Sequence, residues 1–311
     1  MTPHRLALGW MLFCLCLFAA PTTFADTRDI QSRWVSAISA DNVSVLRALL
    51  DEAGELGEIG SADKNEGSVS EPLWKVTASN GKSALMVACK VGDAALAMRL
   101  VELGSNIQDR TITNGTAFMF AVLGNQTTLA QWLVGLGANI DAQGSNGWTS
   151  VMIASAKGLN TTLDWLLSEG ANAQTPDVYG FTPLMRASDN GHTTAVRLLL
   201  GEGVGHSGAA DSGVSSGDSA DGPVDGHAIA VDVHWQDELE NTALHYAVAG
   251  NFHEIVQLLL KADASVKTKN KAGLSALDLA KKNANESTGN ASLKKRQRVL
   301  LKTLMDVDKA G

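Results

Sequence analysis

A short pattern recurs along this chain at a spacing of 33 residues. Each copy has a serine or threonine, an apolar residue two positions later and an alanine five positions later; the alanines are Ala88, Ala121, Ala154, Ala187, Ala247 and Ala280. One step, from Ala187 to Ala247, spans 60 residues and therefore carries 27 additional ones. A fixed period of this length is typical of a protein built from stacked units that bury their apolar side chains against one another.

The residue types in each unit predict two short helices joined by a tight turn. The serine or threonine supplies an oxygen that caps free backbone N–H groups at the start of the first helix. A pair of leucine or valine residues, such as Leu133-Val134, marks the buried stripe of the second helix, and a glycine such as Gly137 ends it. Between the helices stands a residue that tolerates a left-handed backbone: Gly92, Asn125, Gly158, Gly191 or Asn251.

This spacing resembles that of the ankyrin repeat family. The segments that carry the resemblance are GFTPLMRASDNGH at 180–192, ENTALHYAVAGN at 240–251 and GLGANIDA at 135–142. The resemblance covers about residues 30 to 310. It implies an all-α repeat solenoid of about six to seven units, each with two helices and a β-hairpin finger. It also implies a concave protein-binding face and no catalytic activity.

Three segments depart from the regular units of the predicted domain, which occupies residues 26–311. Two segments are predicted to be flexible insertions, one at about 52–72 and the other at about 204–232. The second is too rich in glycine, serine and aspartate to stay ordered. Residues of about 292–306 are predicted to form a helix that caps the open end of the stack. A solvated outer face explains its basic residues, with an anionic-membrane patch as the alternative: Lys294, Lys295, Arg296 and Arg298.

Residues 1–25 are predicted to be a signal peptide. A basic start precedes an apolar run of about 15 residues and then small residues before Asp26, which is the layout of a cleaved secretory leader. A retained membrane anchor is the alternative, although the run is short for a hydrocarbon core of about 30 Å. Cleavage of the leader would remove Cys14 and Cys16 and leave Cys89 as the single cysteine. An exported chain with one cysteine is predicted to be a bacterial periplasmic protein, with secretion as the second choice.

Motifs for nucleophilic, metallohydrolase or phosphate-binding chemistry are absent from the sequence, so we expect no catalytic residue, cofactor or metal. The resemblance implies that His245 hydrogen-bonds to neighbouring groups instead of acting as a general base. Histidine and aspartate residues in and beside 204–232 leave a loose metal site as an alternative. Cys89 is expected to be a small buried hydrophobe, with a redox thiol as the alternative. A net charge of −8 argues against nucleic acid as a partner.

Two functions remain open at this stage. The first is that of a non-enzymatic scaffold, adaptor or inhibitor, exported as a monomer, that holds another cell-envelope protein in its concave groove. The second is that of an accessory factor in periplasmic oxidative-stress defence, which acts either through redox-sensitive methionines or as a protector of an envelope enzyme. A sulfur ladder would carry the redox-sensitive form, and simple apolar filling is its alternative. The methionines concerned share one position of successive units: Met86, Met119, Met152 and Met185.

Partner-binding residues are predicted at the positions that flank the finger glycine and precede the helix turn, which face the groove in ankyrin-like stacks. Trp148 and Phe181 share one such position in adjacent units, with Tyr179 beside them, and aromatic residues favour binding hot spots. The alternative is that these rings lean back onto neighbouring fingers. The other predicted partner-binding residues are Asn80, Lys82, Lys90, Leu123, Lys157, Asp189, Asn190 and Asn241, and further groove positions include Ile112, Val178 and Leu239.

Overall fold

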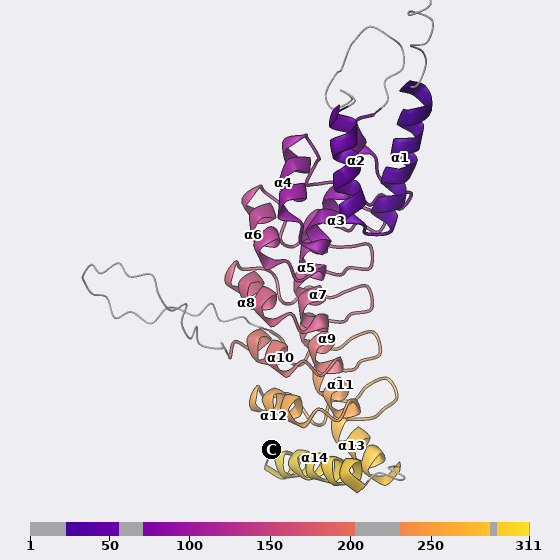
Figure 1. Ribbon diagram of the computed structural model, residues 1–311. Helices are drawn as coiled ribbons and strands as arrows, with labels where there is room; N and C mark the ends of the chain where they lie inside the picture. Colours follow the sequence, from indigo (N-terminus) through magenta and orange to yellow (C-terminus); the bar gives the residue numbers. More distant parts are fainter. Residues whose placement is uncertain (1–22, 56–70, 203–230, 287–290, 311) are drawn as a thin grey trace, which may run out of the picture.

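The computed structural model describes residues 23–55, 71–202, 231–286 and 291–310 (Figure 1). Within these ranges the chain forms seven helix pairs and no β-strand, which confirms the predicted all-α solenoid. The elements are α1 Thr23–Ser39, α2 Val43–Glu55, the 3₁₀ turn η1 Leu73–Lys75, α3 Ala84–Val91, α4 Ala94–Glu102, α5 Ala117–Leu123, α6 Thr127–Gly135, α7 Ser150–Lys157, α8 Asn160–Ser168, α9 Pro183–Asp189, α10 Thr193–Leu199, α11 Ala243–Ala249, α12 His253–Lys261, α13 Ala276–Glu286 and α14 Ala291–Ala310.

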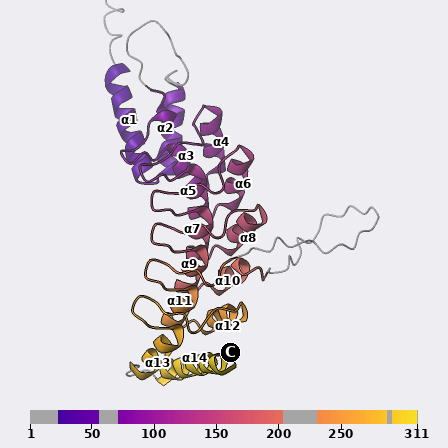
Figure 2. The same ribbon diagram turned by 180° about the vertical axis from the view of Figure 1, so that it is seen from behind.

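The helices stack in two layers. Helices α3, α5, α7, α9, α11 and α13 follow one another in an inner column, and α4, α6, α8, α10 and α12 form an outer column beside it. The loops that join successive units project from the other side of the inner column, as both views show (Figures 1 and 2). Helix α14 lies across the end of the stack and packs on α13 and α12.

Local sequence explains why each inner helix begins and ends where it does. The hydroxyls of Ser83 and Thr182 accept the N–H groups of Met86 and Met185 at 3.3 Å, and the equivalent threonines of α5 and α7 do the same. At the turns, Gly191 has a φ of +73° and Asn125, Asn251 and the other predicted residues are also left-handed. The predicted turns are therefore confirmed, as are the hydroxyl caps of α3, α5, α7, α9 and α13. At α11 the Thr242 hydroxyl caps no backbone N–H and hydrogen-bonds to His245 Nδ1 instead.

The core runs the length of the stack. The pattern alanines from Ala88 to Ala247 are 0% exposed, which lets neighbouring inner helices approach closely. Met86, Met152 and Met185 are 0–1% exposed and Met119 is 7% exposed. These methionines fill the core between units, as the packing explanation of their spacing requires.

The loops between units, here called fingers, are turns and not the β-hairpins that the resemblance implied. In the finger at 177–181, the Asp177 N–H donates to the Phe181 carbonyl, but the N–H of Val178 at the tip donates to Asn146 O of the preceding finger. The same bond recurs at every step, from Ile112 to Asn80 and from Lys271 to Leu239. Two of the described fingers contain an isolated antiparallel bridge, Arg110 with Thr116 and Lys269 with Ser275, and none contains a pair of strands.

Two predicted boundaries differ in the structure. Helix α2 continues to Glu55, so residues 52–55 are helical and not part of an insertion. Helix α14 covers Ala291–Ala310 and is longer than the predicted cap at 292–306. The predicted flexible segments fall mainly on 56–70 and 203–230, which lie outside the described residues. Residues 1–22 of the predicted leader also lie outside them, and its residues 23–25 form the start of α1.

Candidate protein-binding surface

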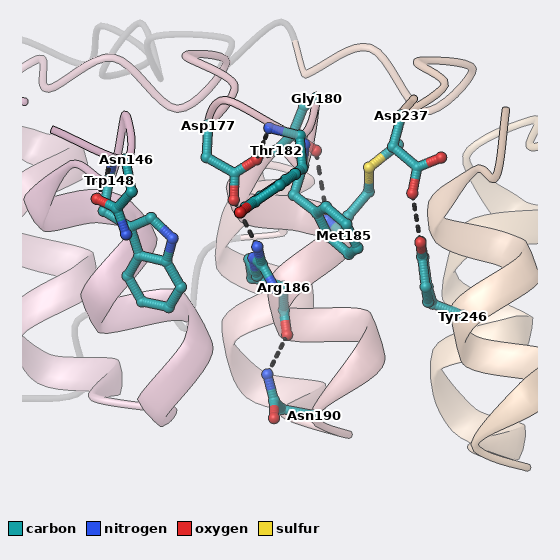
Figure 3. Close-up of polar contacts among 12 residues, drawn as sticks. Asn146, Trp148, Asp177, Gly180, Thr182, Met185, Arg186, Asn190, Asp237 and Tyr246 are labelled. Atoms are coloured by element: carbon teal, nitrogen blue, oxygen red, sulfur yellow. Dashed lines mark hydrogen bonds and ion pairs between the residues drawn. The ribbon is translucent and has the colours of Figure 1, made fainter. Parts of the chain in front are cut away.

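An arginine between aromatic rings joins three successive units (Figure 3). Arg186 lies on α9, and its guanidinium carbon is 3.9 Å from the centre of the Phe181 ring and 5.1 Å from that of Trp148. Phe181 in turn packs on Tyr246 of α11, with ring centres 5.0 Å apart. Contacts between a partly desolvated guanidinium and aromatic faces contribute about 0.5–2 kcal/mol. We call Trp148, Arg186, Phe181 and Tyr246 the aromatic stack.

Buried carboxylates hold this stack in place. Asp177, whose side chain is 0% exposed, pairs with Arg186 at 2.5 Å and accepts the N–H groups of Tyr179 and Phe181 at 2.9 and 3.0 Å. Asp237 is the equivalent residue of the next unit and accepts the hydroxyl of Tyr246 (Figure 3). Burial and this hydrogen bond raise the pKa of Tyr246. Each carboxylate thus ties a finger to the helix that follows it.

Several predicted partner-binding residues are engaged within the protein. Trp148 and Phe181 are half-buried in the aromatic stack, which is the arrangement of rings leaning onto neighbouring units. Asn241 is half-buried and donates to the Tyr246 hydroxyl at 3.3 Å. Leu123 is half-buried against the core. The structure therefore gives these four side chains a packing role, and their contact with a partner stays a prediction.

Two of the three lysines predicted to face a partner, Lys82 and Lys90, form ion pairs with Asp41, and their contact with a partner stays a prediction. Lys82 is buried and pairs with Asp41, and the ammonium of Lys90 lies 2.7 Å from the same carboxylate. Burial alone would raise the pKa of Asp41, but hydrogen bonds from both lysines outweigh it and lower that pKa. Asp41 stands at the left-handed turn between α1 and α2, with a φ of +53°. The ion pairs thus join the first unit to the second.

Other predicted residues lie open to solvent. Asn80, Lys157, Asp189 and Asn190 are exposed, and Tyr179 is 58% exposed at a finger tip. Three apolar groove positions are also exposed at the tips: Ile112 at 74%, Val178 at 52% and Leu239 at 58%. We call Ile112, Val178, Tyr179 and Leu239 the apolar tips. Val178 and Tyr179 share one finger, and Leu239 lies on the next. Ile112 lies on an earlier finger, separated from that of Val178 by one finger.

Trp235 is a residue that sequence reasoning missed. It is 38% exposed, and its indole N–H donates to Gly180 O of the preceding finger at 2.9 Å. The equivalent positions of earlier units hold Thr175, Ala142 and Asp109, so no periodic signal marks it.

His245 has the structural role that the sequence suggested. Its Nδ1 accepts the N–H of Thr242 at 3.1 Å, and its Nε2–H donates to the carbonyl of Leu274 at 3.2 Å. This arrangement needs a neutral ring. Burial lowers the pKa of His245, although the Leu274 bond and the charge of Asp237 act in the opposite direction.

This lowered pKa predicts a loss of stability in mild acid. Unfolded histidine titrates near pH 6.5, so the unfolded chain binds the proton first, and the contribution of His245 is complete above that pH and lost as pH falls below it. His245→Met introduces the residue found at this position in four other units. We expect unfolding free energy to fall less between pH 7.5 and 5.5 in this variant than in the wild type, as measured by chemical denaturation. An equal fall in both proteins would contradict this role for His245.

Two family models match the chain. The model described as ankyrin repeats (3 copies) matches residues 34–144 and 118–207, and the model described as ankyrin repeats (many copies) matches residues 227–280. The chain belongs to the ankyrin repeat family. Ankyrin repeats are in general protein-interaction domains and not enzymes. A search of curated proteins found no match.

Metal binding, thiol reactivity and membrane-spanning helices can also be assessed in the described part of this ankyrin repeat protein. No group of three histidine, cysteine or carboxylate side chains there could hold a metal ion. Cys89 is buried, and burial raises the pKa of its thiol to about 12. A thiol with such a pKa is a poor nucleophile and reacts slowly with oxidants. No helix among the described residues is long and apolar enough to cross a membrane.

Proposed function

We propose that this ankyrin repeat protein is a non-enzymatic scaffold that binds a protein partner through its finger tips. The observation that carries the proposal is the exposure of four large apolar side chains, the apolar tips, on fingers that are bonded to their neighbours. Exposed apolar side chains that gather on a rigid frame mark interaction sites, because burying them against a partner costs little conformational entropy in the frame.

Three of the apolar tips are proposed to contribute most to binding. Tyr179 and the neighbouring Val178 lie at one tip, and Leu239 follows at the next finger, whose Glu238 N–H donates to Tyr179 O at 3.1 Å. Trp148 and Phe181, by contrast, share their faces with Arg186 and Tyr246. We therefore place the centre of the proposed site at Val178, Tyr179 and Leu239, with the aromatic stack as its support.

We also propose that the protein works as an exported monomer on a cell-envelope partner. The support is the leader-like composition of residues 1–25, in which an apolar run ends in small residues before Asp26. Among the two functions considered, the scaffold receives the stronger support. The methionines that would form an oxidant-sensitive ladder are buried, and an oxidant in solution does not reach such side chains readily.

A triple variant tests the scaffold proposal. Val178→Ser, Tyr179→Ser and Leu239→Ser together are expected to weaken capture of an envelope partner at least about thirtyfold, because central hot-spot residues each contribute about 2 kcal/mol or more. The melting temperature is expected to stay close to that of the wild type, because exposed side chains contribute little to stability. Capture is measured by quantitative pull-down from envelope extract, and melting by circular dichroism.

The matched control removes exposed apolar side chains from the outer column. Met98 on α4 is 43% exposed and Leu136, just after α6, is 44% exposed. The Met98→Ser, Leu136→Ser variant should capture the partner as the wild type does. Undiminished capture by the triple variant, or an equal loss in this control, would move the binding site away from the finger tips.

A further inference from the structure

The outer face of the last helix differs in charge from the rest of the protein. Helix α14 carries six basic residues and two acidic ones: Lys294, Lys295, Arg296, Arg298, Lys302 and Lys309, with Asp306 and Asp308. The whole chain has a net charge of −8. The last helix is therefore a cationic region at one end of an acidic protein.

The inner side of α14 is apolar, and the basic side chains lie on the opposite side. Leu300 and Leu304 are 2% and 0% exposed and face α13 and α12. Lys294, Lys295, Arg298, Val299 and Lys302 are all exposed. At 100° per residue these five positions fall on one side of a helix, away from Leu300 and Leu304. We call these five residues the cap face.

No ion pair among the described residues neutralises the cap face. The ion pair that α14 makes in that part of the chain joins Asp308 to Lys267, and it lies at the far end of the helix. The cap face also contains an apolar side chain, Val299, which is 47% exposed, and Met305, which is 37% exposed, lies one turn beyond. Unpaired cations interspersed with apolar side chains are the composition of helices that lie on a membrane surface.

We propose that the cap face binds the surface of a membrane that contains anionic phospholipids. The ammonium and guanidinium groups would contact lipid phosphates, while Val299 and Met305 would enter the region between headgroups. Because α14 lies across the end of the stack (Figures 1 and 2), this binding would place the solenoid upright on the membrane with its fingers facing sideways. The finger tips would then remain open to a protein partner.

The apolar residues favour lipid over nucleic acid as the occupant. Nucleic acid offers phosphates too, but proteins that hold single strands add aromatic side chains on which bases stack. Helix α14 contains no aromatic residue, and the exposed apolar side chains on the side of its cap face are Val299 and Met305. A bilayer interface accepts such side chains, whereas a duplex backbone does not.

Vesicle binding tests the proposal. The full chain is mixed with vesicles of phosphatidylcholine alone and with vesicles that contain about one third phosphatidylglycerol, and the ratio of the two partition coefficients is measured by co-sedimentation. The ratio is used because the apolar run in residues 1–25 would bind both kinds of vesicle alike. Each basic residue at an anionic surface raises binding about fivefold at moderate salt. Arg298→Glu with Lys302→Glu is therefore expected to lower the ratio at least about twentyfold.

A charge-matched control separates this site from net charge. Lys75 and Lys269 are exposed and lie outside the cap face and the apolar tips, so Lys75→Glu with Lys269→Glu makes the same change in net charge elsewhere. The control should keep most of the wild-type ratio, and added salt should lower that ratio in the wild type. The proposal is overturned if the ratio is near one in the wild type or if the control loses as much as the test variant. Tight binding to duplex DNA without preference for anionic vesicles would overturn it as well.

Discussion

Replacing Asp177 with alanine is expected to lower the free energy of unfolding by about 3 kcal/mol. The substitution removes the carboxylate that pairs with Arg186, so the arginine is left between aromatic rings with 19% of its side chain exposed and no counter-charge. It also removes the acceptor of the Tyr179 and Phe181 N–H groups. Chemical denaturation followed by circular dichroism measures the loss.

Two further variants divide this loss into its parts. Asp177→Asn keeps a side-chain carbonyl, and Asn270 shows that an asparagine at this position accepts the same two finger N–H groups, at 3.1 Å each. We expect this variant to lose only the ion pair and to be more stable than Asp177→Ala. Asp189→Ala removes an exposed carboxylate of the same unit and should change stability by less than about 0.5 kcal/mol. If Asp177→Ala were as mild as Asp189→Ala, Asp177 would not support the stack.

Gly191→Ala is expected to lower the free energy of unfolding by about 3 kcal/mol. The backbone at Gly191 has a φ of +73°, which costs a residue with a side chain about 1–2 kcal/mol. A Cβ there would also lie 2.5 Å from the Phe252 ring of the following unit, and relieving that contact costs about 1–3 kcal/mol more. The turn of one unit is therefore fitted closely to the next.

Gly170 provides the control for this prediction. Its φ is +79°, but a Cβ added to it would meet no atom within 4 Å. Gly170→Ala should therefore show the backbone strain alone, at about 1 kcal/mol. Shortening the ring with Phe252→Leu should recover part of the loss in Gly191→Ala, and a double-mutant cycle measures that coupling. Equal losses at both glycines would show that the contact with Phe252 does not matter.

The helical units could be predicted from the sequence because their determinants are local. A capping hydroxyl, a small alanine and a left-handed turn residue lie within ten residues of one another, and each acts through its own backbone. The structure has all three where the period placed them, as at Thr182, Ala187 and Gly191. The stacking of these units then follows from their inability to bury apolar side chains alone.

The environment of the candidate site could not be predicted in the same way. Whether Lys82 faces a partner depends on Asp41, which lies 41 residues away in the sequence. The position of Trp148 depends on Arg186, a residue of the next unit that varies between copies of the pattern. A one-unit pattern contains no information about such pairs. The pattern predicts the tips as groove positions together with Trp148 and Phe181, but only the structure shows that the tips are exposed while the two rings are half-buried.

The hydrogen bonds between finger tips keep the same pattern whether the segment between two fingers is short or long. Tyr179 O accepts the N–H of Glu238 across 27 surplus residues in the same way that Asn146 O accepts the N–H of Val178 across an ordinary unit. Additional sequence can therefore be inserted between α10 and α11 in an engineered variant. A reporter, an epitope or a second binding domain placed there would travel with the solenoid, while the spacing of the recognition elements on either side stayed as it is.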